Sequence, residues 1–71
     1  MKSARIYTVY LNYGYDNEKE LFDSTNKDEA LDWAEDHSDS EIGPGDSMEV
    51  IWFADDGEAM TEWLLSYEDM E

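Results

Sequence analysis

The chain carries no lysine or arginine beyond Lys27, and this one-sided distribution of charge limits the folds open to it. Residues 28–71 contain 16 of the 20 Asp and Glu, whereas residues 1–27 contain four acids and all four bases. The formal net charge of −16 therefore belongs to the last 44 residues. Self-repulsion of this size destabilises a compact state, and a domain this small rarely has more than about 3–5 kcal/mol of stability. We expect a fold that segregates the negative charge on one side of its surface.

Apolar residues occur in short clusters between turn residues, which predicts a single domain over residues 1–71. The segment 4–13 is rich in Tyr, Val, Ile and Thr, which is typical of a strand. After a polar turn, residues 20–24 are its expected hairpin partner. Residues 48–54 form a third apolar strand in this interpretation, and an Asp-Gly turn follows at 55–57.

The segment 58–67 fits two structures. Its apolar spacing is helical, but the tight turn before it favours a strand. We expect the strand, which gives the order ββαββ. This is an α+β fold, with an antiparallel sheet of about four strands and one acidic helix packed on one face. A helical last segment is the alternative, and the acidic tail 68–71 is expected to be frayed.

The central helix is predicted from residue 27 to about residue 39. Asn26 followed by Glu29 resembles a capping box, and Thr25 with Asp28 is the alternative register. At 100° per residue the apolar side then consists of Ala30, Leu31, Trp33 and Ala34.

The other side of this predicted helix is acidic. Like charges at i,i+4, such as Asp28–Asp32 and Asp32–Asp36, destabilise a helix by a few tenths of a kcal/mol each. The helix dipole compensates only those near the N-terminus. A sequence that keeps this cost over three turns is expected to use the acidic face. The acids that fall within an arc of roughly 120° are Asp28, Glu29, Asp32, Glu35, Asp36 and Asp39.

Composition excludes several classes of function. Direct binding to a nucleic-acid backbone comes from Lys and Arg, so a chain this acidic is not expected to bind one. An anionic membrane surface repels it, and no run approaches the ~18 apolar residues of a membrane span. Zero cysteine excludes disulfides and thiolate chemistry. Together with the lack of an apolar signal core near the start, it favours a cytoplasmic protein.

Catalysis and metal binding have little support in the residues. His37 is expected to be a structural residue near the end of the helix, and no nucleophile elbow or phosphate-binding glycine loop is present. A calcium loop that starts at Asp36 has Glu41, and one that starts at Asp16 has Leu21, where glycine is required. We therefore predict no enzyme and no catalytic, cofactor-binding or metal-ligating residue.

Carboxylates on a rigid fold can instead imitate phosphates. Helix neighbours at i,i+4 lie about 5–6 Å apart at Cβ, and strand residues i and i+2 lie about 6.6 Å apart. Both distances are comparable with the spacing of phosphates along one strand. Strongly basic protein surfaces are most often nucleic-acid-binding channels, so the expected partner is a basic nucleic-acid-binding protein. The helix row, extended over the loop and hairpin, gives the predicted partner-binding residues: Asp28, Glu29, Asp32, Glu35, Asp36, Asp39, Glu41, Asp46, Glu49, Asp55, Asp56, Glu58 and Glu62.

In length, acidity, lack of cysteine, aromatic content and one-sided charge, the chain resembles the small acidic DNA-mimic proteins that phages and mobile elements encode against host defence. Mimics of this class share surface charge rather than a sequence motif. The resemblance implies a stoichiometric inhibitor of an anti-restriction or anti-CRISPR type. Such a phage protein acts in the host cytoplasm and blocks the nucleic-acid-binding groove of a CRISPR effector, a restriction enzyme or another nuclease.

Other interpretations stay open at this point. An acidic adaptor or regulatory module would bind a basic protein without competing with nucleic acid. An edge strand could serve β-augmentation or a homodimer, with charge only preventing aggregation. Acidity as a solubility device or as an adaptation to high salt is the plainest alternative. Ten aromatic residues exceed what one helix can cover, so some are expected to be exposed binding anchors.

Overall fold

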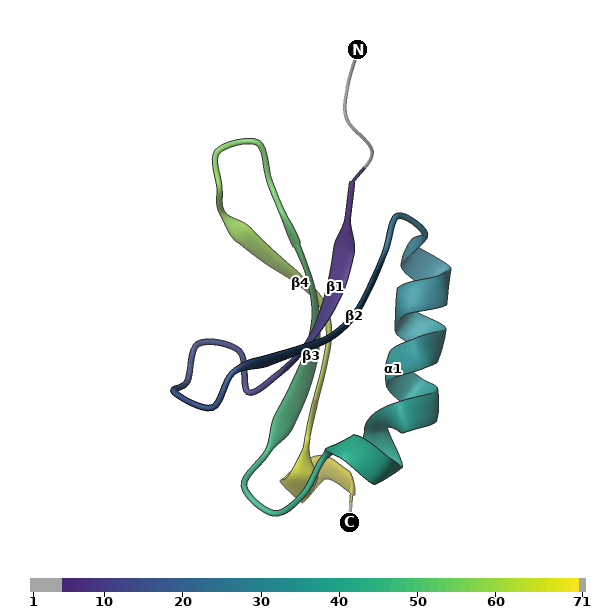
Figure 1. Cartoon of the computed structure of the whole chain (residues 1–71), viewed down its shortest axis with the longest axis vertical. Coiled ribbons are helices and arrows are strands. Elements are labelled where there is room, and N and C mark those ends of the chain that lie inside the picture. Colours follow the sequence, from purple (N-terminus) through teal and green to yellow (C-terminus); the bar gives the residue numbers. More distant parts are fainter. Residues whose placement is uncertain (1–4, 71) are drawn as a thin grey trace.

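The computed structural model describes residues 5–70, which form a four-stranded antiparallel sheet with one helix on one of its faces (Figure 1). The strand order is β2-β1-β3-β4, so the two hairpins meet along β1 and β3. The predicted ββαββ order and α+β class are confirmed. The elements are β1 (Tyr7–Leu11), β2 (Lys19–Ser24), α1 (Lys27–Glu41), β3 (Ser47–Phe53), β4 (Ala59–Ser66) and a short 3-10 helix, η1 (Tyr67–Met70).

The ambiguous segment near the C-terminus is a strand, β4, and the helical alternative is wrong. The pairing of β3 with β4 shifts after Val50↔Trp63, because the next pair is Ile51↔Thr61 and Glu62 is an extra residue. Such a bulge bends a strand and breaks its period of two. It places Met60, opposite Trp52, on the same face as Trp63. The bulge therefore produces the i,i+3 spacing that resembles a helix in the sequence.

The C-terminal segment forms a short helix where the sequence predicted a frayed tail. Residues 67–70 form η1, and the hydroxyl of Ser66, the last residue of β4, donates to Asp69 Oδ2 at 2.9 Å. Tyr67 and Met70 pack against the core. Most of the tail expected to be frayed thus has a defined 3-10 conformation, and Glu71 lies outside the described residues. At the other end the predicted strand from 4 to 13 is longer than β1, and its first residue, Ala4, also lies outside them.

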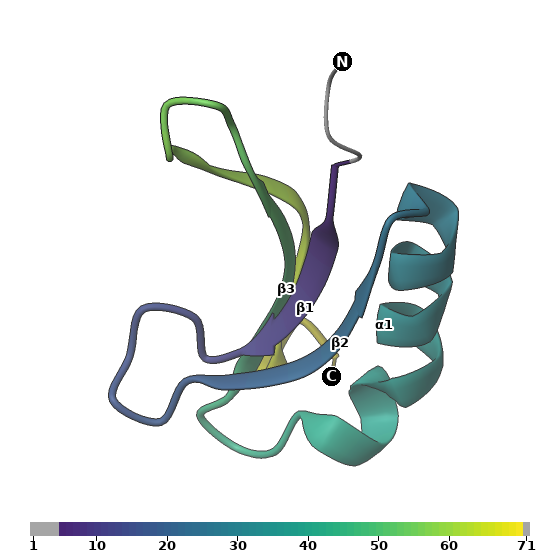
Figure 2. The ribbon, with the colours of Figure 1, turned by 45° about the horizontal axis from the view of Figure 1, so that its top comes forward.

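The core lies between the sheet and α1. Val9, Met48 and Val50 are fully buried on the face of the sheet that the helix covers. The helix contributes Ala30 and Ala34, which are also fully buried. These small side chains let α1 lie close to the sheet, where it packs against β1, β2 and β3. Figure 2 shows α1 alongside β2, with the β3–β4 hairpin curling away from it.

Asn12 joins the end of β1 to the loop before β3. Its backbone has a φ of 56°, a left-handed conformation that asparagine tolerates better than most residues. The Asn12 backbone N donates to Ser47 O at 2.8 Å, and its Oδ1 accepts from Ser47 N at 3.0 Å. Its Nδ2 donates to Asp46 Oδ1 at 2.9 Å, while Asp46 Oδ2 accepts from Gly43 N at 3.1 Å. The carboxylate of Asp46 therefore links the end of β1, through Asn12, to the loop before β3, through Gly43.

Replacing Asp46 with asparagine is expected to lower the melting temperature at pH 7, because the amide presents a donor to the Gly43 N–H. Hydrogen bonds from Asn12 and then Gly43 lower the pKa of Asp46 below its ordinary 3.8, against a smaller opposing effect of burial. A lowered folded-state pKa adds stability above the unfolded pKa that is lost as the pH falls through the folded one. Thermal unfolding of both proteins should show a difference that is constant above about pH 5 and vanishes at lower pH.

The matched control for this substitution is Asp55→Asn, which removes the same charge from an exposed turn residue. Subtracting the change in melting temperature of Asp55→Asn from that of Asp46→Asn leaves the contribution of the Asp46 hydrogen bonds. It removes the stabilisation that comes from losing one negative charge. A difference between the Asp46 variant and the control that persisted unchanged below about pH 3 would contradict the role of the ionised carboxylate.

Candidate functional site

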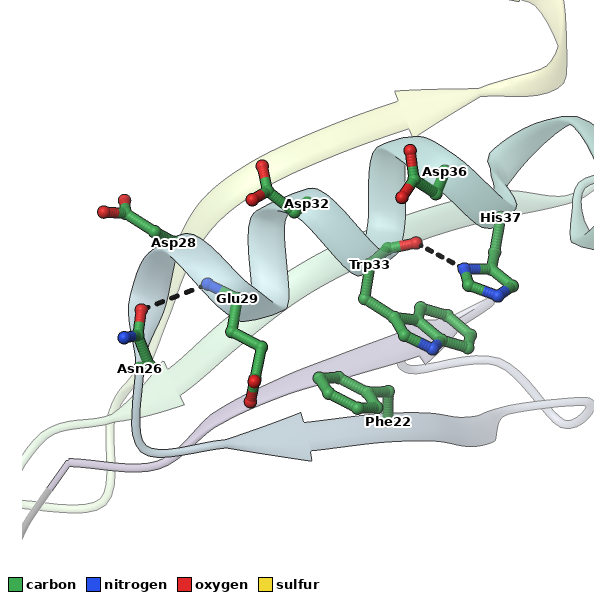
Figure 3. Close-up of a pocket in the computed structure, with 8 residues that line it drawn as sticks. All are labelled: Phe22, Asn26, Asp28, Glu29, Asp32, Trp33, Asp36 and His37. Carbon is green, nitrogen blue, oxygen red and sulfur yellow. Dashed lines mark hydrogen bonds between the residues drawn. The ribbon is translucent and has the colours of Figure 1, made fainter.

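The residues that form the acidic helix face are all exposed, and all but Glu29, whose side chain reaches toward β2, lie on the side of α1 away from the sheet. Figure 3 shows Asp28, Asp32 and Asp36 in one row along this outer side. With their neighbours they make up the surface named here the acidic helix face: Asp28, Glu29, Asp32, Glu35, Asp36 and Asp39.

The start of α1 fixes the first of these carboxylates. Asn26 is the N-cap, and its side chain accepts from Glu29 N at 3.1 Å, so the first of the two predicted registers is confirmed. The Glu29 side chain does not return to Asn26 N. It accepts from the Ser24 hydroxyl, and Ser24 Oγ in turn accepts from Asn26 N at 3.0 Å. The Ser24 hydroxyl thus stands between Asn26 N and the Glu29 carboxylate, which contact each other directly in a capping box. One carboxylate oxygen of Glu29 is engaged within the fold.

The other members of the acidic helix face have no such engagement. Among residues 5–70, no hydrogen bond is formed by the carboxylates of five of them. No lysine or arginine follows Lys27 in the sequence to neutralise them. These five side chains therefore present their full charge to solvent: Asp28, Asp32, Glu35, Asp36 and Asp39.

The remaining predicted partner-binding residues are dispersed. Asp55, Asp56 and Glu58 surround the turn of the β3–β4 hairpin, on the far side of the sheet from α1 (Figures 1 and 2). Asp56 Oδ1 accepts from Glu58 N at 3.0 Å. Glu41 is the half-buried last residue of α1. The structure thus does not join the hairpin acids to the helix row in one surface.

Two strand carboxylates of the predicted set are also engaged locally. Glu49 lies on the face of the sheet opposite the helix, and its Oε2 accepts from the Thr61 hydroxyl at 3.2 Å. Glu62, the bulged residue of β4, accepts from Trp52 Nε1 at 2.9 Å. Glu49 and Glu62 each have one carboxylate oxygen engaged within the fold, and Asp46 has both. Among the predicted partner-binding residues, the acidic helix face is the largest group of exposed carboxylates on one element.

An aromatic stack that the sequence analysis missed borders this face. The ring of Trp33 stacks on Phe22 of β2 at 5.2 Å between centroids, with an angle of 5° between the planes. It also stacks on His37 at 3.9 Å and 12°, and His37 Nδ1 donates to Trp33 O at 2.8 Å (Figure 3). In the sequence, only the i,i+4 spacing of Trp33 and His37 indicated that their rings would be neighbours on the helix. Because α1 continues to Glu41, His37 lies within the helix rather than near its end.

Within the first hairpin, Tyr10 has a shifted pKa that comes from burial and from the hairpin's own carboxylates. Burial raises the pKa of Tyr10 first, and the carboxylates of Glu20 and Glu18 raise it further. The phenol therefore stays protonated to a higher pH than a free tyrosine. A raised folded-state pKa of this kind adds stability that is present below the ordinary value of 10.0 and lost as the pH rises through the folded value.

Thermal stability is expected to rise with ionic strength, because salt screens repulsion within residues 28–70. Between about 10 and 300 mM salt we expect an increase in melting temperature of roughly 4–8 °C, which corresponds to about 1 kcal/mol in a domain of this size. Sodium chloride and choline chloride at equal ionic strength should give the same rise. A flat or falling melting temperature would contradict a concentrated field, and a rise with sodium alone would indicate a cation site instead.

Within residues 5–70, no group of three or more His, Asp or Glu side chains converges in a way that could hold a metal ion. None of the helices in this part of the chain combines the length and the apolar character that a membrane crossing requires. Comparison with protein-family models, with curated proteins and with solved structures finds no match to this chain.

Proposed function

We propose that this protein is a non-enzymatic nucleic-acid mimic that binds and blocks the basic nucleic-acid-binding surface of another protein. The observation that carries the proposal is the row of unengaged carboxylates on α1. Asp28 and Asp39 are 11 residues apart, or about 16 Å along the axis, so the five unengaged carboxylates lie one per about 3–4 Å of helix axis. One DNA strand has a phosphate per about 3.4 Å of helix axis.

The rigidity of α1 supports the same proposal. The helix is capped at Asn26 and packed through Ala30 and Ala34, so its outer face is held in place before binding. A preorganised charged surface loses less entropy on association than a flexible acidic tail. It also accelerates encounter with a basic partner through electrostatic steering.

The class of partner follows from the resemblance noted above to small acidic DNA mimics. We propose a nuclease or effector of a host defence system, such as a CRISPR or restriction complex, as the target, with the protein acting as a phage anti-defence inhibitor in the cytoplasm. The competing proposal is an acidic adaptor that binds a basic protein elsewhere on its surface. The two differ in one measurable respect, which is whether nucleic acid and this protein exclude each other.

The test is affinity retention from a nuclease-treated bacterial lysate on three immobilised proteins. The first is the natural protein, the second carries Asp28→Asn, Asp32→Asn and Asp36→Asn, and the third carries Asp55→Asn, Asp56→Asn and Glu58→Gln. Each variant removes three charges, one set from α1 and one from the hairpin turn.

The proposal predicts a nucleic-acid-binding protein that the natural protein and the hairpin variant retain, that the helix variant does not, and that added duplex DNA or RNA elutes. A retained protein that salt elutes but nucleic acid does not would establish the adaptor instead. Equal loss of retention in both variants would mean that only total charge matters.

A further inference from the structure

The aromatic stack and the acidic helix face border one hollow on the side of α1. Its volume is about 600 Å³ and it is open to solvent. Asp28, Asp32 and Asp36 form one i,i+4 row of the helix, and Glu29, Trp33 and His37 form the next, so the hollow follows the groove between two ridges of side chains. Phe22 from β2 and Asn26 from the N-cap complete the lining (Figure 3).

The two margins of this groove differ in chemistry. The margin away from the sheet consists of three carboxylates, while the margin near β2 has the rings of Phe22, Trp33 and His37. A carboxylate row attracts any cation, but flat ring faces favour a cation that is itself flat. Guanidinium stacks on aromatic rings and forms two parallel hydrogen bonds with a carboxylate, whereas an ammonium group is a strongly hydrated point charge.

The same protein already contains an arginine bound on an aromatic ring. The guanidinium carbon of Arg5 lies 3.7 Å from the centroid of the Trp52 ring, and Arg5 Nη1 donates to the Tyr7 hydroxyl at 3.3 Å. No lysine or arginine of the described residues lines the hollow of α1. The negative charge of the hollow is therefore complementary to a cationic group, and no described residue of this chain supplies one there.

We propose that this hollow is an arginine-binding site, which takes the guanidinium group of a partner protein between the carboxylate row and the aromatic stack. The site rests on the proposed function only in that the partner is a basic protein. It adds that the partner presents arginine rather than lysine at this point, and that the rings of Phe22, Trp33 and His37 contribute to binding.

Acetylated and amidated hexa-arginine and hexa-lysine peptides test the site, because they carry equal charge. The expected difference is an arginine peptide bound about two- to fivefold tighter per occupied hollow, from the ring contact. In NMR titrations the hexa-arginine peptide should shift the ring protons of Phe22 and His37 and the Trp33 indole N–H. Those of Trp63, on the opposite edge strand β4, should move little.

Substitutions test whether the aromatic rings cause the preference for arginine over lysine. Trp33→Leu should reduce the arginine-to-lysine affinity ratio toward one, and Trp63→Leu, an equal change at another half-buried tryptophan, should leave it unchanged. Asp32→Asn should weaken both peptides, and the arginine peptide somewhat more, because a carboxylate forms two parallel hydrogen bonds with guanidinium but not with an ammonium group. Circular dichroism checks that each variant is folded. If Trp33→Leu is unfolded, the NMR shifts that hexa-arginine causes in the natural protein test the arginine site instead.

A ratio that Trp33→Leu leaves intact, or shifts spread evenly over α1 and the hairpin turn, would overturn the arginine site. This result is separable from the fate of the proposed function, because no nucleic acid is present in the peptide titrations. A protein that binds arginine in the hollow but never competes with nucleic acid would keep this site and refute the mimic.

Discussion

Replacing Asp32 with lysine is expected to weaken binding of the basic partner by at least about 30-fold, which corresponds to roughly 2 kcal/mol. Asp32 lies in the middle of the carboxylate row, and its carboxylate forms no hydrogen bond with another residue of 5–70. The substitution removes one attraction and adds a repulsion at the centre of the surface. Because the carboxylate supports nothing in the fold, the loss should appear as a faster dissociation rate without unfolding.

The same substitution should stabilise the free protein. The introduced ammonium group would stand between Asp28 and Asp36 and convert two repulsive i,i+4 pairs into attractive ones, a gain of about 1 kcal/mol in total. The melting temperature should rise by about 4–8 °C at low salt. Loss of binding combined with a gain of stability is the mark of a surface kept for function rather than for folding.

Asp55→Lys is the matched control, with the same change of charge at the hairpin turn on the far side of the sheet. It should reduce partner affinity only by the small amount that long-range charge contributes. Equal losses for Asp32→Lys and Asp55→Lys, measured by surface plasmon resonance at one salt concentration, would show that α1 is not the contact surface.

Replacing Met48 with alanine is expected to unfold a large fraction of the protein at room temperature. Met48 is fully buried in β3, at the centre of the cluster between the sheet and α1. Truncation of a buried methionine to alanine costs about 2–5 kcal/mol. The whole domain has only about 3–5 kcal/mol available, and its net charge reduces this further.

Met60→Ala is the control for the core, because Met60 is 38% exposed on the edge strand β4. Its cost should stay below about 1 kcal/mol. Urea titration followed by circular dichroism measures both variants. A midpoint for Met48→Ala within experimental error of that for Met60→Ala would mean that the core lies elsewhere than between the sheet and the helix.

The helix and strands could be predicted from the sequence because, in most of them, apolar residues recur with a single period from one end to the other. The 3.6-residue spacing of Ala30 and Ala34 and the cap at Asn26 defined α1, and the turn residues separated the strands. The last strand was ambiguous because the bulge at Glu62 interrupts its alternation. The short helix η1 could not be predicted, since it is held by Tyr67 and contacts with the core rather than by local preference.

The candidate site was predictable only as far as one helix extends. Helical periodicity places six acids within one arc, and the structure keeps them exposed. Their relation to the hairpin acids depends on how β3 and β4 curl away from α1, which no local pattern encodes (Figure 2). The engagement of Asp46 depends on Asn12, 34 residues away in the sequence, and the stack of Trp33 on Phe22 depends on the docking of α1 beside β2.

The central claim is that the acidic helix face takes the place of nucleic acid on a basic partner. The most direct measurement uses the protein retained in the affinity experiment, bound to a fluorescent duplex of its preferred nucleic acid, while this chain is titrated in and anisotropy is followed. The account predicts release of the duplex to its free value at one equivalent, and release with Asp32→Lys only at about 30-fold higher concentration. Binding of this chain with the duplex still held, as a stable ternary complex, would contradict the account.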